Sequence, residues 1–228
     1  MTPPPLPDPE ALAARFDADV RAAAGRSTAL LRKLRQRYSR ELRSADAGYV
    51  LADARALIDR GYNWTGWELI RNHRGAFESL DPPALEALGE GMDSWDDVDG
   101  FARTLAGPAW LRGLIDDATV HAWARSPDLW WRRAALVCTV ALNMRSQGGY
   151  GDTPRTLAVG EILADDPERM VQQAISWALR ELVVHDAPAV AAFIDAHEHE
   201  LSARTKREVR HKLATGLKNP RRSVRPAP

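Results

Sequence analysis

The amino-acid sequence predicts an all-α protein in which antiparallel helix pairs follow one another in tandem. Apolar residues recur at helical spacing in almost every segment, whereas the alternating pattern of a half-buried strand is absent. Helix-forming residues such as Ala, Leu, Arg and Glu dominate a chain that is 45% apolar and 27% charged. Gly and Pro, 15 of each, lie mainly between the periodic segments or at the N-terminus. The loops between helices are therefore expected to be short.

Capping residues and prolines mark where the helices are expected to begin. Ser94 precedes Trp95-Asp96-Asp97, so its hydroxyl can accept from an early amide while the carboxylates favour the positive end of the helix dipole. Pro82, Pro127 and Pro167 mark further starts, because proline is tolerated in a first helical turn. The expected helices, in chain order, span residues 9–24, 28–43, 46–60, 63–78, 82–91, 95–106, 117–125, 129–144, 153–164, 168–185, 187–199 and 203–216.

These segments make about six helix pairs, recurring roughly every 35 to 40 residues as in HEAT-like or armadillo-like arrays. A pair of this size cannot bury its apolar stripe alone, so neighbouring pairs must stack into a curved α-solenoid with a concave groove. The predicted organisation is a flexible N-terminus over residues 1–8, a single HEAT-like repeat domain over 9–218 and a flexible basic tail over 219–228.

The composition argues against membrane and disulfide-linked proteins. No apolar run reaches the roughly 18 residues of a membrane span, and the Pro-rich residues 1–9 lack a signal-peptide core. The one cysteine, Cys138, lies in an apolar run and is expected to be a core residue, not a nucleophile or a metal ligand. A cytoplasmic protein is therefore expected.

Charge is distributed unevenly, although the net charge is zero. From residue 203 onward nine Lys or Arg residues accompany a single acid, Glu208, while residues 1–202 hold 22 basic and 30 acidic side chains. A basic end of this kind can contact phosphates and release their counterions. It can equally be a solvated helix end and tail.

Three stretches carry a more specific signal, namely residues 94–99 (SWDDVD), 130–135 (WWRRAA) and 173–181 (QAISWALRE). In order and spacing they resemble the AlkD family of bacterial DNA alkylation repair glycosylases, which are built from HEAT-like repeats. The resemblance implies that Asp99 is the catalytic carboxylate, that Trp95 and Trp177 face the sugar of the lesion and that Arg133 contacts a phosphate. The other DNA contacts that we expect are basic residues of the later helices and the tail: Arg132, Arg180, Lys206, Arg207, Arg210 and Lys218.

Helical geometry independently places two of these residues beside the apolar stripes of their helices. Trp177 lies about 60° outside the stripe that runs from Val171 to Leu182, and Arg133 lies about 40° outside the next stripe back along the chain. Trp95 and Asp99, at i and i+4, share a helix face. A single tryptophan near an apolar stripe is more often a core or rim residue, so only the joint pattern indicates a site in the groove.

Other chemistries lack their motifs. The six histidines form no H-E-x-x-H, and no P-loop or G-x-S-x-G is present. The segment Gly148-Gly149-Tyr150-Gly151 lacks the strand-to-helix setting of a dinucleotide site. We therefore expect no metal and no cofactor.

The function that the sequence predicts is that of a monomeric, monofunctional DNA glycosylase. Its substrates would be cationic alkylated purines, such as 7-methylguanine and 3-methyladenine, in double-stranded DNA. An alternative is a non-catalytic HEAT-like module that binds branched or damaged DNA, or another protein, through the same groove. A pure protein scaffold is a third possibility, but it gives the basic end and the edge-positioned Trp and Arg residues no shared purpose.

Overall fold

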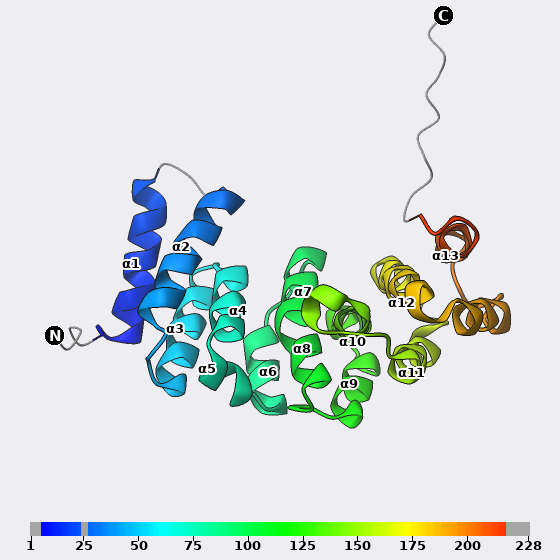
Figure 1. The fold of residues 1–228 in the computed structure, drawn as a ribbon, viewed down its shortest axis with the longest axis horizontal. Coiled ribbons are helices and arrows are strands. Elements are labelled where there is room, and N and C mark those ends of the chain that lie inside the picture. Colours follow the sequence, from blue (N-terminus) through cyan, green and yellow to red (C-terminus); the bar gives the residue numbers. More distant parts are fainter. Residues whose placement is uncertain (1–5, 24–26, 218–228) are drawn as a thin grey trace, which may run out of the picture. The chain divides into compact units, whose positions relative to one another are not determined.

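A computed structural model describes residues 6–23 and 27–217 and divides the chain into two compact units, Met1–Ile115 and Asp116–Pro228. The described residues form helices joined by short loops, with no strand among them (Figure 1). The all-α prediction is therefore confirmed. None of the described helices has the length and apolar character needed to cross a membrane.

The first unit is a succession of packed helices around an aromatic core. Its elements are α1 (Pro9–Ala22), α2 (Thr28–Glu41), α3 (Ala47–Asp59), α4 (Asn63–Asn72), α5 (Arg74–Glu78), α6 (Pro82–Gly89), α7 (Trp95–Phe101), a π-helical turn (Ala102–Ala106) and α8 (Gly107–Leu111). Helix α4 packs against α2, α3 and α7. Phe16 contacts the rings of Tyr38 and Tyr62 edge-on, at centroid distances of 5.1 and 5.2 Å. Trp67 packs on Phe101 at 5.7 Å, which ties α4 to α7.

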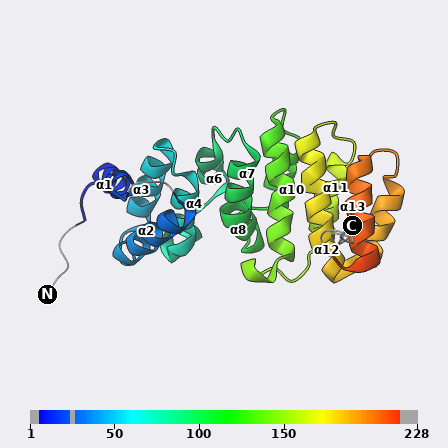
Figure 2. The same cartoon turned by 90° about the horizontal axis from the view of Figure 1, so that it is seen from above.

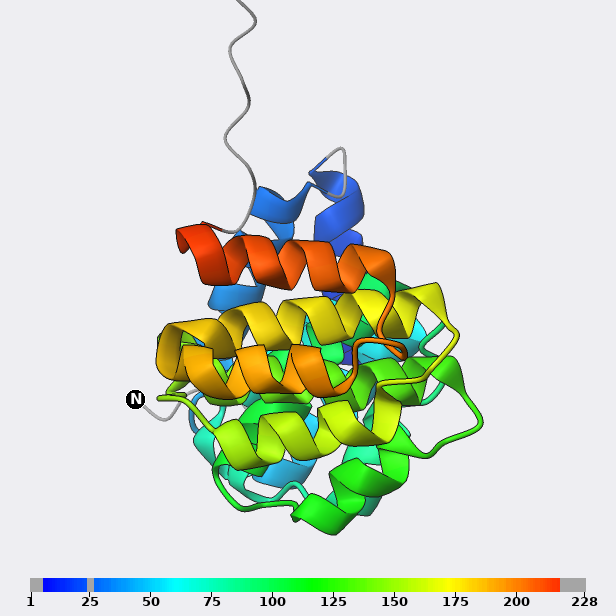
Figure 3. The same ribbon diagram turned by 90° about the vertical axis from the view of Figure 1, so that its right-hand side faces the viewer.

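The second unit is built around α10, which is buried along most of its length. Its elements are α9 (Asp117–Ala124), α10 (Leu129–Asn143), a 3₁₀ turn (Arg145–Gln147), α11 (Thr153–Leu163), α12 (Arg169–Ala196) and α13 (Ala203–Thr215). Within this unit α10 packs on α9, α11 and α12, and α13 lies along α12 (Figures 2 and 3). Cys138 on α10 is fully buried, as expected, and burial raises the pKa of its thiol.

The predicted helix starts are confirmed, although proline plays two different parts in them. At α6, Asp81 accepts a hydrogen bond from the Ala84 amide (2.9 Å) and Pro82 occupies the first turn. Asp128 likewise caps α10, accepting from the Trp130 amide at 2.8 Å, but Pro127 precedes the cap. Pro82 is therefore part of the first turn of α6, whereas Pro127 lies just before α10 begins.

Two helix interruptions separate the observed elements. His73 has extended backbone and divides the expected helix over 63–78, because its Nδ1 accepts from the Ala76 amide at 3.1 Å and starts α5. Asp186 has non-helical backbone inside α12, at the boundary predicted between 185 and 187. Its carboxylate accepts from the Ala189 amide at 3.1 Å, while Pro188 has no N–H to continue the ladder.

Tandem helices of this kind contact mainly their neighbours in the chain. A division into two compact units is compatible with the single HEAT-like repeat domain expected for residues 9–218, which stays a prediction, as does the concave groove. The expected flexible segments 1–8 and 219–228 lie mostly or wholly outside the described residues.

Candidate functional site

Helix α7 begins at Ser94, the capping residue that the sequence predicts. The Ser94 Oγ accepts a hydrogen bond from the Asp97 amide (3.2 Å) and donates one to the Asp97 carboxylate (2.8 Å). Asp97 also accepts from the side-chain amide of Asn63 on α4 at 2.9 Å. Asp97 is thus committed to holding the start of α7, and a carboxylate in a first helical turn also suits the helix dipole.

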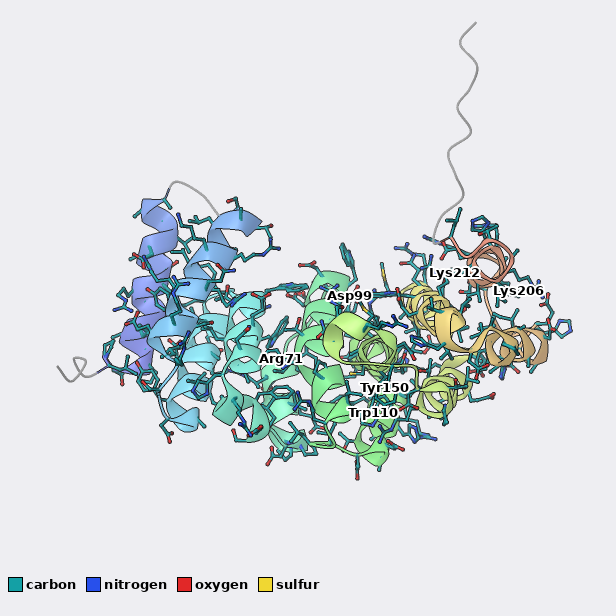
Figure 4. All side chains as sticks on the ribbon, viewed as in Figure 1. Arg71, Asp99, Trp110, Tyr150, Lys206 and Lys212 are labelled. Carbon is teal, nitrogen blue, oxygen red and sulfur yellow. The ribbon has the colours of Figure 1, made fainter. Side chains whose placement is uncertain are left out.

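The two residues that the family resemblance singles out in this stretch are Trp95 and Asp99, one turn apart on α7. The Trp95 side chain is 54% exposed, which is unusual for a large apolar group, and Asp99 is half-buried. Val98 and Phe101 are buried and face the core. The predicted shared face of Trp95 and Asp99 is confirmed, and Figure 4 shows Asp99 on α7 with Trp110 further along the same helical run.

The helical run continues past Asp99 through a π-helical turn that the sequence analysis missed. The Gly107 amide donates to the Ala102 carbonyl, five residues back, and Pro108 follows without an N–H. Proline inside a helix breaks the regular i to i−4 ladder, and a π turn is one way to accommodate the break. The signal in the sequence was Gly107-Pro108, just after the helix expected to end at 106.

In the second unit, Arg133 on α10 departs from its expected exposure. We expected it at a groove surface, but it is only 5% exposed, and its guanidinium donates to the Met170 carbonyl at the start of α12 (2.5 Å). The expectation was wrong because a helical-wheel angle does not show which neighbour covers a flank. Here α12 packs on α10.

Arg132 is held inside the second unit by several acceptors. Its Nε donates to Asp166 at 2.6 Å, and one of its terminal nitrogens donates to the carbonyls of Ser126 (3.0 Å) and Pro127 (2.9 Å). The Asp166 side chain is only 6% exposed, so the ion pair is largely desolvated. These contacts fix the loop before α10, and a DNA contact for Arg132 stays a prediction.

Trp177 lies on α12 outside the buried stripe, as helical geometry predicts. The stripe residues from Val171 to Leu182 are buried, whereas Trp177 is half-buried and its Nε1 donates to Glu181 at 3.2 Å. The indole N–H is therefore bonded within its own helix. The remaining aromatic surface borders solvent.

Glu208 joins charged and polar groups of α12 and α13, although the sequence analysis named it only as the one acid of the basic end. It accepts hydrogen bonds from Ser176 and Arg204, both at 2.7 Å, and pairs with Arg180 at 3.6 Å. Burial alone would raise the pKa of Glu208, but the donors Arg204 and Ser176 and the charge of Arg180 lower it below its ordinary value. The signal was a single acid inside the basic run of α13.

The basic residues of α13 are less available than their number indicates. Lys206 donates to the Glu198 carbonyl (2.5 Å), and Arg210 pairs with the Glu198 carboxylate (2.5 Å). Figure 4 places Lys206 and Lys212 on α13, where Lys212 donates to the Gly216 carbonyl at 2.7 Å. Arg207 is exposed, and Lys218 lies outside the described residues. DNA contacts at all these positions stay predictions.

The family residues are thus distributed over both units. Trp95 and Asp99 share α7 in the first, and Arg133 and Trp177 lie on α10 and α12 in the second. The model of the DNA alkylation repair enzyme family matches residues 7–213, which is most of the chain. The chain belongs to this family. No curated protein gives a significant match to the sequence.

Family membership and the observed geometry agree on the kind of chemistry to be expected. An indole and a carboxylate on one helix face can approach a single cationic group together, the first through its π surface and the second through its charge. The described residues hold no cluster of three His, Cys, Asp or Glu side chains suited to a metal ion. The family is one of DNA alkylation repair enzymes, which implies DNA as the substrate of the chain.

Proposed function

We propose that this protein is a monofunctional DNA glycosylase, which hydrolyses the N-glycosidic bond of cationic alkylated purines in double-stranded DNA. Substrates of the 7-methylguanine and 3-methyladenine type carry the required charge, and we place the reaction in the cytoplasm. The observation that carries the proposal is the exposed indole of Trp95 one turn before the carboxylate of Asp99. Membership of the alkylation repair family supports it.

In this reaction the base is already a good leaving group, and the main barrier is the positive charge that develops on the sugar. Alkylation at N3 or N7 makes the purine cationic, so the base takes both electrons of the C1′–N bond and leaves as a neutral molecule. The deoxyribose is left with oxocarbenium character. An ionised Asp99 stabilises that cation and accepts the proton of the water that attacks C1′, which yields an abasic site.

The remaining family residues would position the nucleotide. The indoles of Trp95 and Trp177 offer apolar faces for the deoxyribose and negative π surface for a nearby cation. Arg133 is buried and anchored at the Met170 carbonyl, so its positive charge, more than a direct contact, would favour a nearby phosphate. No step in this scheme needs a metal or a cofactor.

The test is incubation of the protein with a duplex that contains one 7-methylguanine, followed by alkaline cleavage at any abasic site. We expect strand cleavage at the lesion and none in an undamaged duplex. Binding without base release would instead support the non-catalytic DNA-binding module. Borohydride should trap no covalent protein–DNA adduct, since no lysine nucleophile takes part.

A further inference from the structure

A cleft of about 520 Å³ lies in the first unit, beside the helix that carries Trp95 and Asp99. Its walls come from α2, α4 and the run that continues α7, and they include Thr28, Arg32, Trp64, Glu68, Asp96 and Arg103. The cleft holds two arginines and two acids. Which of these charges are already satisfied decides what it can bind.

Both acids of the cleft have donors within the protein. Glu68 accepts from the Arg35 Nε at 2.9 Å, and Asp96 accepts from the Trp64 indole N–H at 3.2 Å. The charge of Glu68 is compensated by Arg35, whereas the exposed Asp96 carboxylate accepts, among the described residues, only a neutral N–H. A cationic ligand would have to compete with these donors.

The two arginines are placed differently. Among the described residues no carboxylate forms an ion pair with Arg32 or Arg103. The Arg103 guanidinium lies over the Trp64 ring, 5.8 Å from its centroid, and its Nε is buried without a hydrogen-bond partner. A buried donor without an acceptor is costly, and no ion pair within the described part of the chain offsets the charge of this guanidinium, so an anion in the cleft that Arg103 lines would be stabilised.

Helix α2 adds to the positive potential at this place. It carries five basic residues and one acid between Thr28 and Glu41, and its amino end, with Thr28, borders the cleft. Arg35 and Arg37 pair with Glu68 and Asp19, but Arg32 stays exposed at the cleft wall. The basic character of this helix is missed when only the C-terminal run of the sequence is counted.

We propose that this cleft binds a phosphate of the DNA backbone, with Arg32 and Arg103 as its donors and Trp64 as the wall that holds Arg103 in place. The inference rests on the proposed function, which supplies DNA as the ligand. Arg103 lies four residues after Asp99 in one helical run. A phosphate bound here fixes the register of the duplex relative to Trp95 and Asp99.

Binding of a labelled, undamaged duplex over a range of salt concentrations tests the proposal. The variants are Arg32→Gln and Arg103→Met. The methionine keeps an aliphatic side chain over Trp64 and removes the charge. Each should weaken binding roughly tenfold and lower the slope of log affinity against log salt by about one. The matched control is Arg74→Met, because the Arg74 side chain on α5 is 88% exposed and its one ion pair among the described residues is with Glu78 on its own helix. It should leave both quantities unchanged.

A double-mutant cycle with the DNA identifies the phosphate. Duplexes with one neutral methylphosphonate at successive positions are bound to the wild type and to Arg103→Met. When the methylphosphonate replaces the phosphate that Arg103 contacts, Arg103→Met should cause no further loss of affinity. In the unmodified duplex, Arg103→Lys should recover part of the affinity that Arg103→Met loses. The inference would be overturned if the affinity losses from Arg103→Met and from the methylphosphonate were additive at every position, while the variant protein kept the melting temperature of the wild type.

Base release separates this inference from the proposed function. A wild type that releases 7-methylguanine, together with arginine variants that bind as the wild type does, leaves the function standing and refutes the phosphate site. A wild type that releases nothing, together with the expected binding losses, refutes the glycosylase and supports the phosphate site.

Discussion

Gly100 lies directly against the indole of Trp64, and a Cβ at position 100 would stand 2.5 Å from the Trp64 Cε2 atom. Two further residues of the same helical run contact Trp64: its indole N–H donates to Asp96, and the Arg103 guanidinium lies over its ring. Helix α7 therefore carries Asp99 next to a glycine against which the Trp64 side chain of α4 is packed. We therefore expect the geometry of Asp99, the proposed catalytic carboxylate, to depend on that contact.

Gly100→Ala should both destabilise the protein and slow base release. The methyl group forces the indole or α7 to shift, and overpacking of this kind costs about 1–3 kcal/mol of unfolding free energy. The measurements are thermal melting and single-turnover release of 7-methylguanine. Gly75→Ala is the control, because its Cβ meets nothing closer than 3.5 Å. A Gly100→Ala protein with unchanged melting and unchanged release would refute the dependence of Asp99 on the Trp64 contact.

Asp99→Asn should abolish most base release and leave the affinity for duplex DNA nearly unchanged, since the substitution removes charge and keeps shape. Single-turnover excision and anisotropy on the same preparation give the two numbers. Asp93→Asn, at an exposed position just before α7, is the matched control and should retain activity. Activity retained in Asp99→Asn would remove the carboxylate from the mechanism.

Asp53 should make the stability of the first unit depend on pH. It is fully buried on α3, neither carboxylate oxygen has a hydrogen-bond partner, and burial raises its pKa from 3.8 to about 7, against the opposing charge of Arg15. The folded state therefore holds this proton more tightly than the unfolded state does. Stability contributed by the neutral carboxyl is present at pH 4 and is lost as pH rises towards 7.

Asp53→Asn tests that dependence. The amide stays neutral, so the variant should melt like the wild type near pH 4 and at higher temperature near pH 8. The gain has an upper limit of about 4 kcal/mol, at about 1.4 kcal/mol per pKa unit. Asp59→Asn, on the same helix but exposed and paired with Arg55, should show no such gain. Equal effects of Asp53→Asn at both pH values would mean that Asp53 does not titrate in this range.

The helices could be predicted because their signals are local. Ser94, Asp81 and Asp128 cap the helices that their sequence context predicts, and the apolar stripe of α12 is buried as its periodicity requires. The break at His73 was missed because an imidazole is an uncommon cap. The π turn before Pro108 was missed because periodicity alone does not show whether an amide bonds to the carbonyl five residues back or to the one four residues back.

The site was predictable only where one helix determines it. Trp95 and Asp99 share α7, so their spacing in the sequence predicted their common face. The burial of Arg133 depends on how α12 covers α10, and the cluster around Glu208 depends on how α13 lies on α12. Such relationships arise from packing between helices, and spacing along one helix carries no information about them.

His197 should contribute stability at low pH. Its Nδ1 lies 2.5 Å from a Glu200 carboxylate oxygen and its Nε2 lies 2.9 Å from one of Glu161. Burial alone would lower the pKa of His197, but the two glutamates raise it above 6.5. The stabilisation is therefore complete below about pH 6 and is lost as pH rises through the folded-state pKa. His197→Gln should lower the melting temperature more at pH 5.5 than at pH 9, whereas His121→Gln, outside this cluster, should not; equal losses at both pH values contradict the assignment.

Trp177→Ala should chiefly lower base release, and comparison with Trp67→Ala shows why. Trp67 is 1% exposed in the core of the first unit, and truncating a buried tryptophan costs about 3–5 kcal/mol of unfolding free energy. Trp177 is half-buried beside the stripe of α12, so its removal leaves a smaller cavity and a smaller melting loss. Arg133→Ala, by contrast, should lower both the melting temperature and the DNA affinity. The melting temperature falls because the Met170 carbonyl loses the donor that Arg133 supplies. Melting and single-turnover release measured on the same purified variants separate the two roles. A Trp177→Ala protein that melts as early as Trp67→Ala, yet releases 7-methylguanine at the normal rate per folded molecule, would make Trp177 a core residue and remove it from the proposed site.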